Sequence, residues 1–160
     1  MPVNRFVRFT IDLAADDAAA AVTQRTPRPR AAEFPCTGAV RPRAPHRYVY
    51  GARVAHASLN NPFQGVVRVD MESGEEAAHF PGARRFTNEP VFVPRPRPAT
   101  EDDGHLLVIV FDAERRRSAL YIYDARALEE GPVAVVWLRR AVPYGLHGSF
   151  VPGETFGALA

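Results

Sequence analysis

The chain has 160 residues, of which 46% are hydrophobic and 24% are charged, so its length suits a single globular domain over residues 1–160 with one buried core. Its 20 basic residues are all Arg and are interspersed with 18 acidic residues, for a formal net charge of +2. This pattern lacks the single-sign basic stripe of nucleic-acid binders, so we expect no nucleic-acid partner. No window approaches the roughly 18 uncharged residues of a membrane span, and the N-terminus lacks a signal pattern, so we expect a cytoplasmic protein.

The first part of the chain predicts short strands joined by turns and loops. Residues 5–13 alternate apolar and polar side chains, which is typical of a half-buried strand. The following residues, as far as Thr23, are rich in Ala but carry no amphipathic stripe, so they predict a turn and a return strand rather than a helix. Pro-rich segments 26–30 and 41–45 predict connecting loops, and the aromatic segment 46–50 predicts the next strand. Cys36, the only cysteine, has no disulfide partner and is predicted to be a small core residue.

Two further strands are predicted in the middle of the chain. Residues 67–71 alternate again, and the Glu72–Glu75 segment that follows has the composition of a hairpin turn. Leu106–Phe111 is a continuous apolar run bounded by Asp and Gly, which predicts a central strand covered on both faces.

A third hairpin is predicted near the C-terminus. Residues 119–124 and 133–138 form its strands, and residues 128–131 form the turn between them. A strand that ends in Asp before a turn thus recurs about every 50 to 60 residues, a repeat typical of stacked blades in a β-propeller. The alternative is a coincidence among ordinary hairpins, and in either case we expect little helix.

Three short motifs carry the chemical signal: Glu33-Phe34-Pro35, the segment 88–96 (NEPVFVPRP) and the segment 142–150 (VPYGLHGSF). Pro beside Glu33 and Glu89 favours extended backbone and predicts carboxylates aimed off strand ends. His147 lies between two glycines that permit close backbone approach to its imidazole. The plainer alternatives are surface glutamates and a buried, hydrogen-bonded histidine.

The three motifs, in this order and approximate spacing, resemble the C-terminal third of the carotenoid cleavage oxygenases. The resemblance implies an all-β fold, in which this chain forms about three C-terminal blades of a seven-bladed β-propeller and is incomplete. It also implies an Fe2+ cofactor held by four histidines from different blades. By this resemblance His147 is the last iron ligand, and Glu33 and Glu89 are the carboxylates that hydrogen-bond ligand imidazoles. The family commonly has Phe where Leu146 stands, a change that would alter the apolar substrate tunnel.

In a complete enzyme, the resemblance implies a dioxygenase that adds O2 across a conjugated double bond of a carotenoid, apocarotenoid or stilbene-like substrate. Its partners would be this apolar polyene and O2, with possible contact of the protein with a membrane surface. No general acid or base is predicted. A nucleophilic pair of Ser149 and His147 lacks the surrounding nucleophile elbow. The remaining histidines are predicted to lie in or beside turns as non-ligands, because none shows the spacing of a compact metal site; they are His46, His56, His79 and His105.

The resemblance leaves the upstream three histidines of the family without a counterpart. We therefore expect the chain alone to be neither stably folded nor active, since it lacks the N-terminal blades that close the ring. It is either a truncated product of a complete oxygenase or a short polypeptide that docks on a partner, and Met1 followed at once by a strand favours the first. The competing hypothesis is a non-catalytic propeller fragment that acts as a binding or structural module. That hypothesis predicts that His147, Glu33 and Glu89 do not converge.

Overall fold

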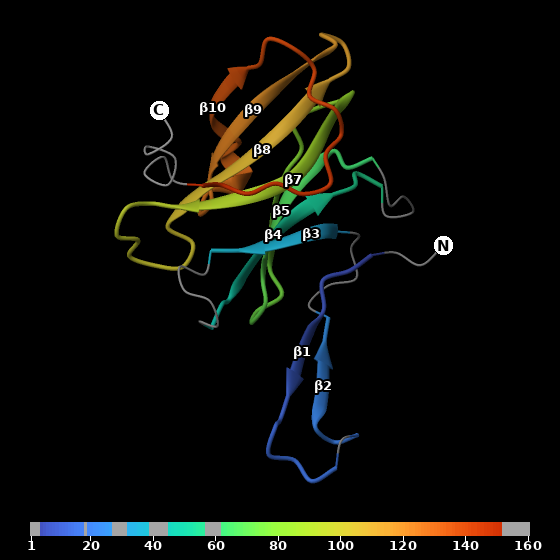
Figure 1. Cartoon of the computed structure of the whole chain (residues 1–160), viewed down its shortest axis with the longest axis vertical. Helices are drawn as coiled ribbons and strands as arrows, with labels where there is room; N and C mark the ends of the chain where they lie inside the picture. The colour runs from blue at the N-terminus through green and yellow to red at the C-terminus, as the bar shows by residue number, and fades with distance from the viewer. Residues whose placement is uncertain (1–3, 18, 27–31, 39–44, 57–61, 152–160) are drawn as a thin grey trace.

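The computed structural model describes residues 4–17, 19–26, 32–38, 45–56 and 62–151. These residues form one two-stranded and two four-stranded antiparallel sheets, with the strand orders β1-β2, β3-β4-β5-β6 and β10-β9-β8-β7 (Figure 1). The strands are β1 (Arg8–Ile11), β2 (Val22–Arg25), β3 (Ala32–Thr37), β4 (Tyr48–Arg53), β5 (Gly65–Asp70), β6 (Glu76–His79), β7 (Arg85–Pro94), β8 (Gly104–Asp112), β9 (Arg117–Asp124) and β10 (Pro132–Trp137). A 3-10 helix, η1 (Leu128–Glu130), is the one helical element among the described residues. None of them forms a helix long and apolar enough to span a membrane.

The β1–β2 hairpin confirms the predicted turn and return strand, but its apolar side chains are not buried. The loop is closed by Asp12, whose carboxylate accepts the Ala14 N–H at 2.9 Å. Phe9 and Ile11 are exposed, and Leu13 is 95% exposed. The prediction of a half-buried strand is therefore wrong, because the hairpin extends away from the two larger sheets (Figure 1) and no described residue covers its apolar face.

The two four-stranded sheets are meanders whose turns are held by aspartates. Asp70 accepts the backbone N–H groups of residues 72–73 at 2.8 and 3.2 Å. Asp112 accepts those of residues 114–115 at 3.0 and 2.9 Å. The Asp side chain takes the place of a backbone acceptor and fixes the start of each turn. The predicted strand-Asp-turn unit at Asp70 is therefore confirmed, and Asp112 forms a further one outside the predicted repeat. The predicted Pro-rich loops lie largely outside the described residues, which include only positions 26 and 45 of them.

The main core lies between the two four-stranded sheets. It is built from Tyr50 and Val66 of one sheet and from alternate residues of β8 and β9 in the other. As predicted, β8 is a central strand, but only one of its faces is fully buried. Leu106 and Val108 are buried, whereas Leu107 and its neighbours on the second face are half-buried. The second face is incompletely covered because, among the described residues, mainly the C-terminal segment 141–150 lies over it.

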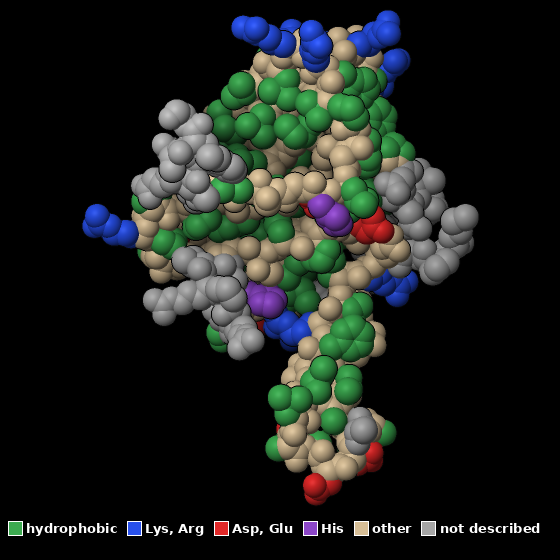
Figure 2. Space-filling view, in the orientation of Figure 1, with side chains coloured by type: hydrophobic (Ala, Val, Ile, Leu, Met, Phe, Trp, Pro, Cys, Tyr) green, Lys and Arg blue, Asp and Glu red, His purple; other side chains and the backbone are tan. Residues whose placement is uncertain are grey.

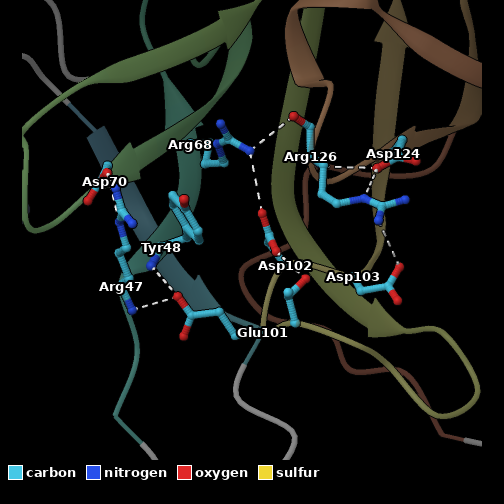
Figure 3. Close-up of polar contacts among 10 residues, drawn as sticks. Arg47, Tyr48, Arg68, Asp70, Glu101, Asp102, Asp103, Asp124 and Arg126 are labelled. Carbon is cyan, nitrogen blue, oxygen red and sulfur yellow. Dashed lines mark hydrogen bonds and ion pairs between the residues drawn. The ribbon is translucent and has the colours of Figure 1, made fainter.

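Charged side chains join the two sheets beside the core (Figure 3). The loop between β7 and β8 carries Glu101, whose carboxylate accepts the backbone N–H groups of residues 47–48 at 2.6 and 2.9 Å. Arg68 of β5 donates to the carbonyl oxygen of Arg126 at 3.0 Å and lies 3.8 Å from the carboxylate of Asp102. These contacts link the two sheets, whose strands β3 and β7 lie close together.

Candidate functional site

Glu33 and Glu89 both lie at irregularities in strand pairing. The register of β3 against β4 shifts between Glu33 and Cys36, and that of β7 against β8 shifts between Thr87 and Pro90. Proline has no N–H for the ladder and is tolerated at such bulges, which also re-aim the neighbouring side chain. The prediction of carboxylates at strand ends is wrong for Glu89, which lies in mid-strand. The neighbouring prolines instead lie where the ladder is interrupted.

Phe34 follows Glu33 with a backbone φ of +56°, a left-handed conformation that is unfavourable for a bulky residue. Such strain persists only where the surroundings enforce it. Its ring packs edge-on against Phe63, with centroids 5.5 Å apart, and against the imidazole of His147, at 5.8 Å and an interplanar angle of 89°. The Phe34 ring therefore packs against one side of the imidazole. Phe34 belongs to the Glu33-Phe34-Pro35 motif, but the sequence alone assigned it no role.

The Glu89 carboxylate binds the His147 segment through both oxygens. Oε2 lies 3.1 Å from Nδ1 of His147, and Oε1 accepts the backbone N–H of Gly148. The His147 side chain is 73% exposed and that of Glu89 is 16% exposed. An ionised carboxylate can only accept, so Nδ1 is the donor, and in a neutral imidazole Nε2 then keeps its lone pair. The pair thus presents Nε2 as a ready ligand atom.

Two residues that sequence analysis missed anchor the segment that carries His147. Ser118 is fully buried, and its Oγ accepts the Val142 N–H at 2.9 Å. The Tyr144 hydroxyl donates to the carbonyl oxygen of Thr87 at 3.3 Å, and burial raises the pKa of this tyrosine. No local sequence pattern predicts these two hydrogen bonds, because one joins residues that are 24 positions apart and the other joins residues that are 57 positions apart.

The expected steric role of the two glycines near His147 is not seen. A methyl group at Gly145 would lie 3.6 Å from Asn88, and one at Gly148 would lie 3.6 Å from the Glu89 carboxylate. Both are ordinary van der Waals separations, so close approach does not require glycine at either position.

One open cavity of about 1650 Å3 gathers the residues singled out by the sequence motifs: Glu33, Glu89, Leu146 and His147 all line it. Its remaining wall is largely apolar, with side chains such as Phe92 and Phe150. Glu33 accepts a hydrogen bond from the side-chain amide of Asn4 rather than from His147. In the space-filling view, one histidine side chain lies next to acidic side chains on the face shown (Figure 2).

The remaining titratable groups differ in their surroundings. His79 and His105 lie at the end of β6 and near the start of β8, beside turns as predicted. His79 pairs with the Tyr123 hydroxyl at 3.2 Å, and burial lowers the pKa of His79. His105 also lines the cavity, with a buried Nδ1 that has no hydrogen-bond partner among the described residues.

Burial raises the pKa of the half-buried Cys36 thiol to about 12, so it stays protonated and unreactive. In the described ranges, no group of three or more His, Cys, Asp or Glu is arranged to hold a metal ion.

Solved structures define the class of fold. The chain superposes on a cobalt-substituted Synechocystis apocarotenoid oxygenase (ACO) with a TM-score of 0.82 and 38% identity, over 93% of this chain and 30% of that one. A chimera of ACO and RPE65 gives a TM-score of 0.82 with 36% identity, over 93% and 30% of the two chains. The three antiparallel sheets therefore match the propeller-type structures of these oxygenases.

Sequence comparison identifies the family. Residues 1–152 match the family described as RPE65, retinal pigment epithelial membrane protein, and the chain belongs to this family of carotenoid cleavage oxygenases. It is 40% identical over 143 residues to the apocarotenoid-15,15'-oxygenase of Synechocystis, covering 89% of this chain and 28% of the relative. It is 34% identical over 123 residues to the carotenoid 9,10(9',10')-cleavage dioxygenase of Crocus sativus, covering 68% and 22%. The chain thus spans less than a third of the length of these relatives.

Proposed function

We propose that this chain forms the C-terminal part of a non-haem Fe2+ dioxygenase that cleaves a conjugated double bond of a carotenoid, apocarotenoid or stilbene-like substrate with O2. The relatives named above are oxygenases and dioxygenases of carotenoids and apocarotenoids. The observation that carries the proposal is the Glu89–His147 pair, which fixes one imidazole nitrogen and leaves the other free as a ligand beside an apolar cavity.

The donor chemistry of His147 fits an iron ligand. A ligating histidine usually donates its second N–H to a carboxylate, which orients the ring and raises the basicity of the ligand nitrogen. Glu89 occupies that position relative to Nδ1, and Phe34 limits rotation of the ring from its side. When bound, Fe2+ would supply O2 activation. The cobalt-substituted relative agrees with a metal in this family.

Glu33 and Leu146 have supporting roles in this proposal. Glu33 would hydrogen-bond another ligand imidazole from beyond this chain, since its carboxylate lines the same cavity and already accepts a polar hydrogen from Asn4. Leu146 would line the passage for the apolar substrate. A polyene offers only apolar surface to its site, and the largely apolar cavity wall suits burial of that surface.

The remaining iron ligands would come from N-terminal blades outside this chain. The described sheets would form about three of the seven blades in total. A single imidazole holds Fe2+ weakly, so the chain alone would be inactive. A cytoplasmic location with peripheral contact to a membrane would give access to an apolar substrate. The alternative of a non-catalytic module required the three motif residues to diverge, and their shared cavity argues against it.

A chimaera tests the proposed function. In it, this chain would replace the matching C-terminal part of the Synechocystis apocarotenoid-15,15'-oxygenase, with which it shares 40% identity. We expect the iron-loaded chimaera to cleave an apocarotenoid into two carbonyl products, identified by chromatography and mass spectrometry. The variant Leu146→Phe should change KM more than kcat, since it alters only the apolar passage. A folded, iron-loaded chimaera without cleavage would contradict the proposal.

A further inference from the structure

Strand β10 leaves one side of its sheet open. It pairs with β9 on one edge, and within the described residues no strand pairs with its other edge. Its side chains are nonetheless apolar: Val133 is 64% exposed, Val136 is 49% exposed, and Val135 and Trp137 are also exposed. Proteins usually protect such an edge with charges, because its free N–H and C=O groups invite pairing with another strand. An apolar open edge is therefore a candidate surface for pairing with another strand.

The charges at the two ends of β10 indicate what that occupant is. Glu129 and Glu130 lie one residue before the strand, and Arg139 and Arg140 lie one residue after it. All four are exposed, and none of them forms an ion pair with another described residue. Basic side chains gather at the far end of this sheet in the space-filling view (Figure 2). The edge is thus an apolar strip with an acidic start and a basic end.

We infer that this edge pairs with β10 of a second copy of the chain. Antiparallel pairing about the middle of the strand is symmetric, so the acidic start of each copy lies beside the basic end of the other. Opposite charges then face each other at both ends of the pair, and the apolar side chains of the two strands become cross-strand neighbours. Parallel pairing would instead place like charges together at both ends. The charge pattern therefore selects a two-fold, edge-to-edge dimer.

The start of the strand limits the extent of this contact. Pro132 has no N–H, and the pairing with β9 shifts between Pro132 and Ala134, so the regular segment available for pairing is residues 134–137. A contact of so few residues is far smaller than a permanent interface. The dimer is accordingly weak, with a population that depends on protein concentration. It involves neither the cavity nor His147, so it stands independently of the proposed function.

Exchange of charge between the two ends tests the dimer. One variant carries Glu129→Arg and Glu130→Arg, and the other carries Arg139→Glu and Arg140→Glu. Each alone places like charges at both ends of the pair, so each should weaken the dimer at least tenfold in sedimentation equilibrium. A one-to-one mixture of the two should recover dimers, since every end then meets the opposite charge.

A matched control variant and measurement in two carrier proteins, the 160-residue chain and the chimaera, complete the test. Glu75→Arg with Glu114→Arg makes the same change of net charge as the Glu129→Arg, Glu130→Arg variant, on exposed turns, and should leave the dimer unchanged. The variants would be measured both in the 160-residue chain and in the chimaera, with circular dichroism to verify folding. A dimer that persists in both charge variants, or a mixture that fails to recover it, would overturn the inference. A wild-type protein that stays monomeric in both carriers would also overturn it and leave the edge to a strand of a longer protein.

Discussion

Substitution of Glu89 by Gln tests how the His147 segment is held. The carboxylate accepts two N–H donors, one from the imidazole at 3.1 Å and one from the Gly148 backbone. A glutamine oxygen can accept only one of them, and its NH2 group would face the other donor. The imidazole is exposed, so its share is small, about 0.5–1 kcal/mol. The Gly148 bond contributes about 1 kcal/mol. The combined loss of about 1.5–2 kcal/mol corresponds to roughly a 10- to 30-fold increase in local opening.

Hydrogen–deuterium exchange of the segment 142–150 measures this opening. The iron-free chimaera is the suitable form, because a bound metal would itself restrain His147. We expect Glu89→Gln to accelerate deuterium uptake in this segment by roughly 10- to 30-fold, with no change in the strands of the core. Glu114→Gln, at an exposed turn, removes the same charge and should leave the uptake unchanged. Equal uptake in the wild type and in Glu89→Gln would refute the two-donor arrangement.

Three other substitutions follow from the contacts around the site and the turns. Ser118→Ala leaves the Val142 N–H without its acceptor, so we expect faster exchange near Val142 and a loss of about 1–3 kcal/mol in stability; unchanged exchange would contradict this anchor. Phe34→Leu removes the edge contact with His147, worth about 0.5–1.5 kcal/mol, and should raise exchange of that segment severalfold, whereas an unaltered rate would mean that the ring does not restrain it. Backbone N–H groups of the turn and neighbouring guanidiniums hold the pKa of Asp112 at about 2, below its usual 3.8. Its stabilisation is therefore present above about pH 4 and lost as the pH falls towards 2, so the stability deficit of Asp112→Asn in denaturant titrations should shrink across that interval; a deficit independent of pH would be inconsistent with this origin.

The hairpins could be predicted from the sequence because their determinants are local. Asp70 and Asp112 fix turns through hydrogen bonds to residues two and three positions away, and strand alternation identifies the residues on each face. Alternation does not reveal whether anything covers that face. Residues 5–13 alternate as a half-buried strand does, yet Phe9 is exposed, because burial depends on the packing of distant elements.

The chemically functional residues of the candidate site could be predicted from the sequence, but the contacts that hold them in place could not. The motifs directed attention to Glu33, Glu89 and His147, and all three line one cavity. The bulges that aim the two carboxylates were signalled only indirectly, by proline within a strand. Ser118 could not be anticipated, since its role depends on a hydrogen bond to a residue 24 positions away, which no local pattern encodes.

Iron content is the most direct test of the proposal that His147 is a metal ligand. The chimaera would be loaded with Fe2+ without oxygen, dialysed, and analysed for iron per protein by atomic emission. We expect the wild-type chimaera to retain about one iron per chain, as one shared site requires. His147→Ala should lose most of it, while His46→Ala, at an exposed loop position, should keep it. Full retention of iron by a folded His147→Ala chimaera would contradict the assignment of His147 as a ligand.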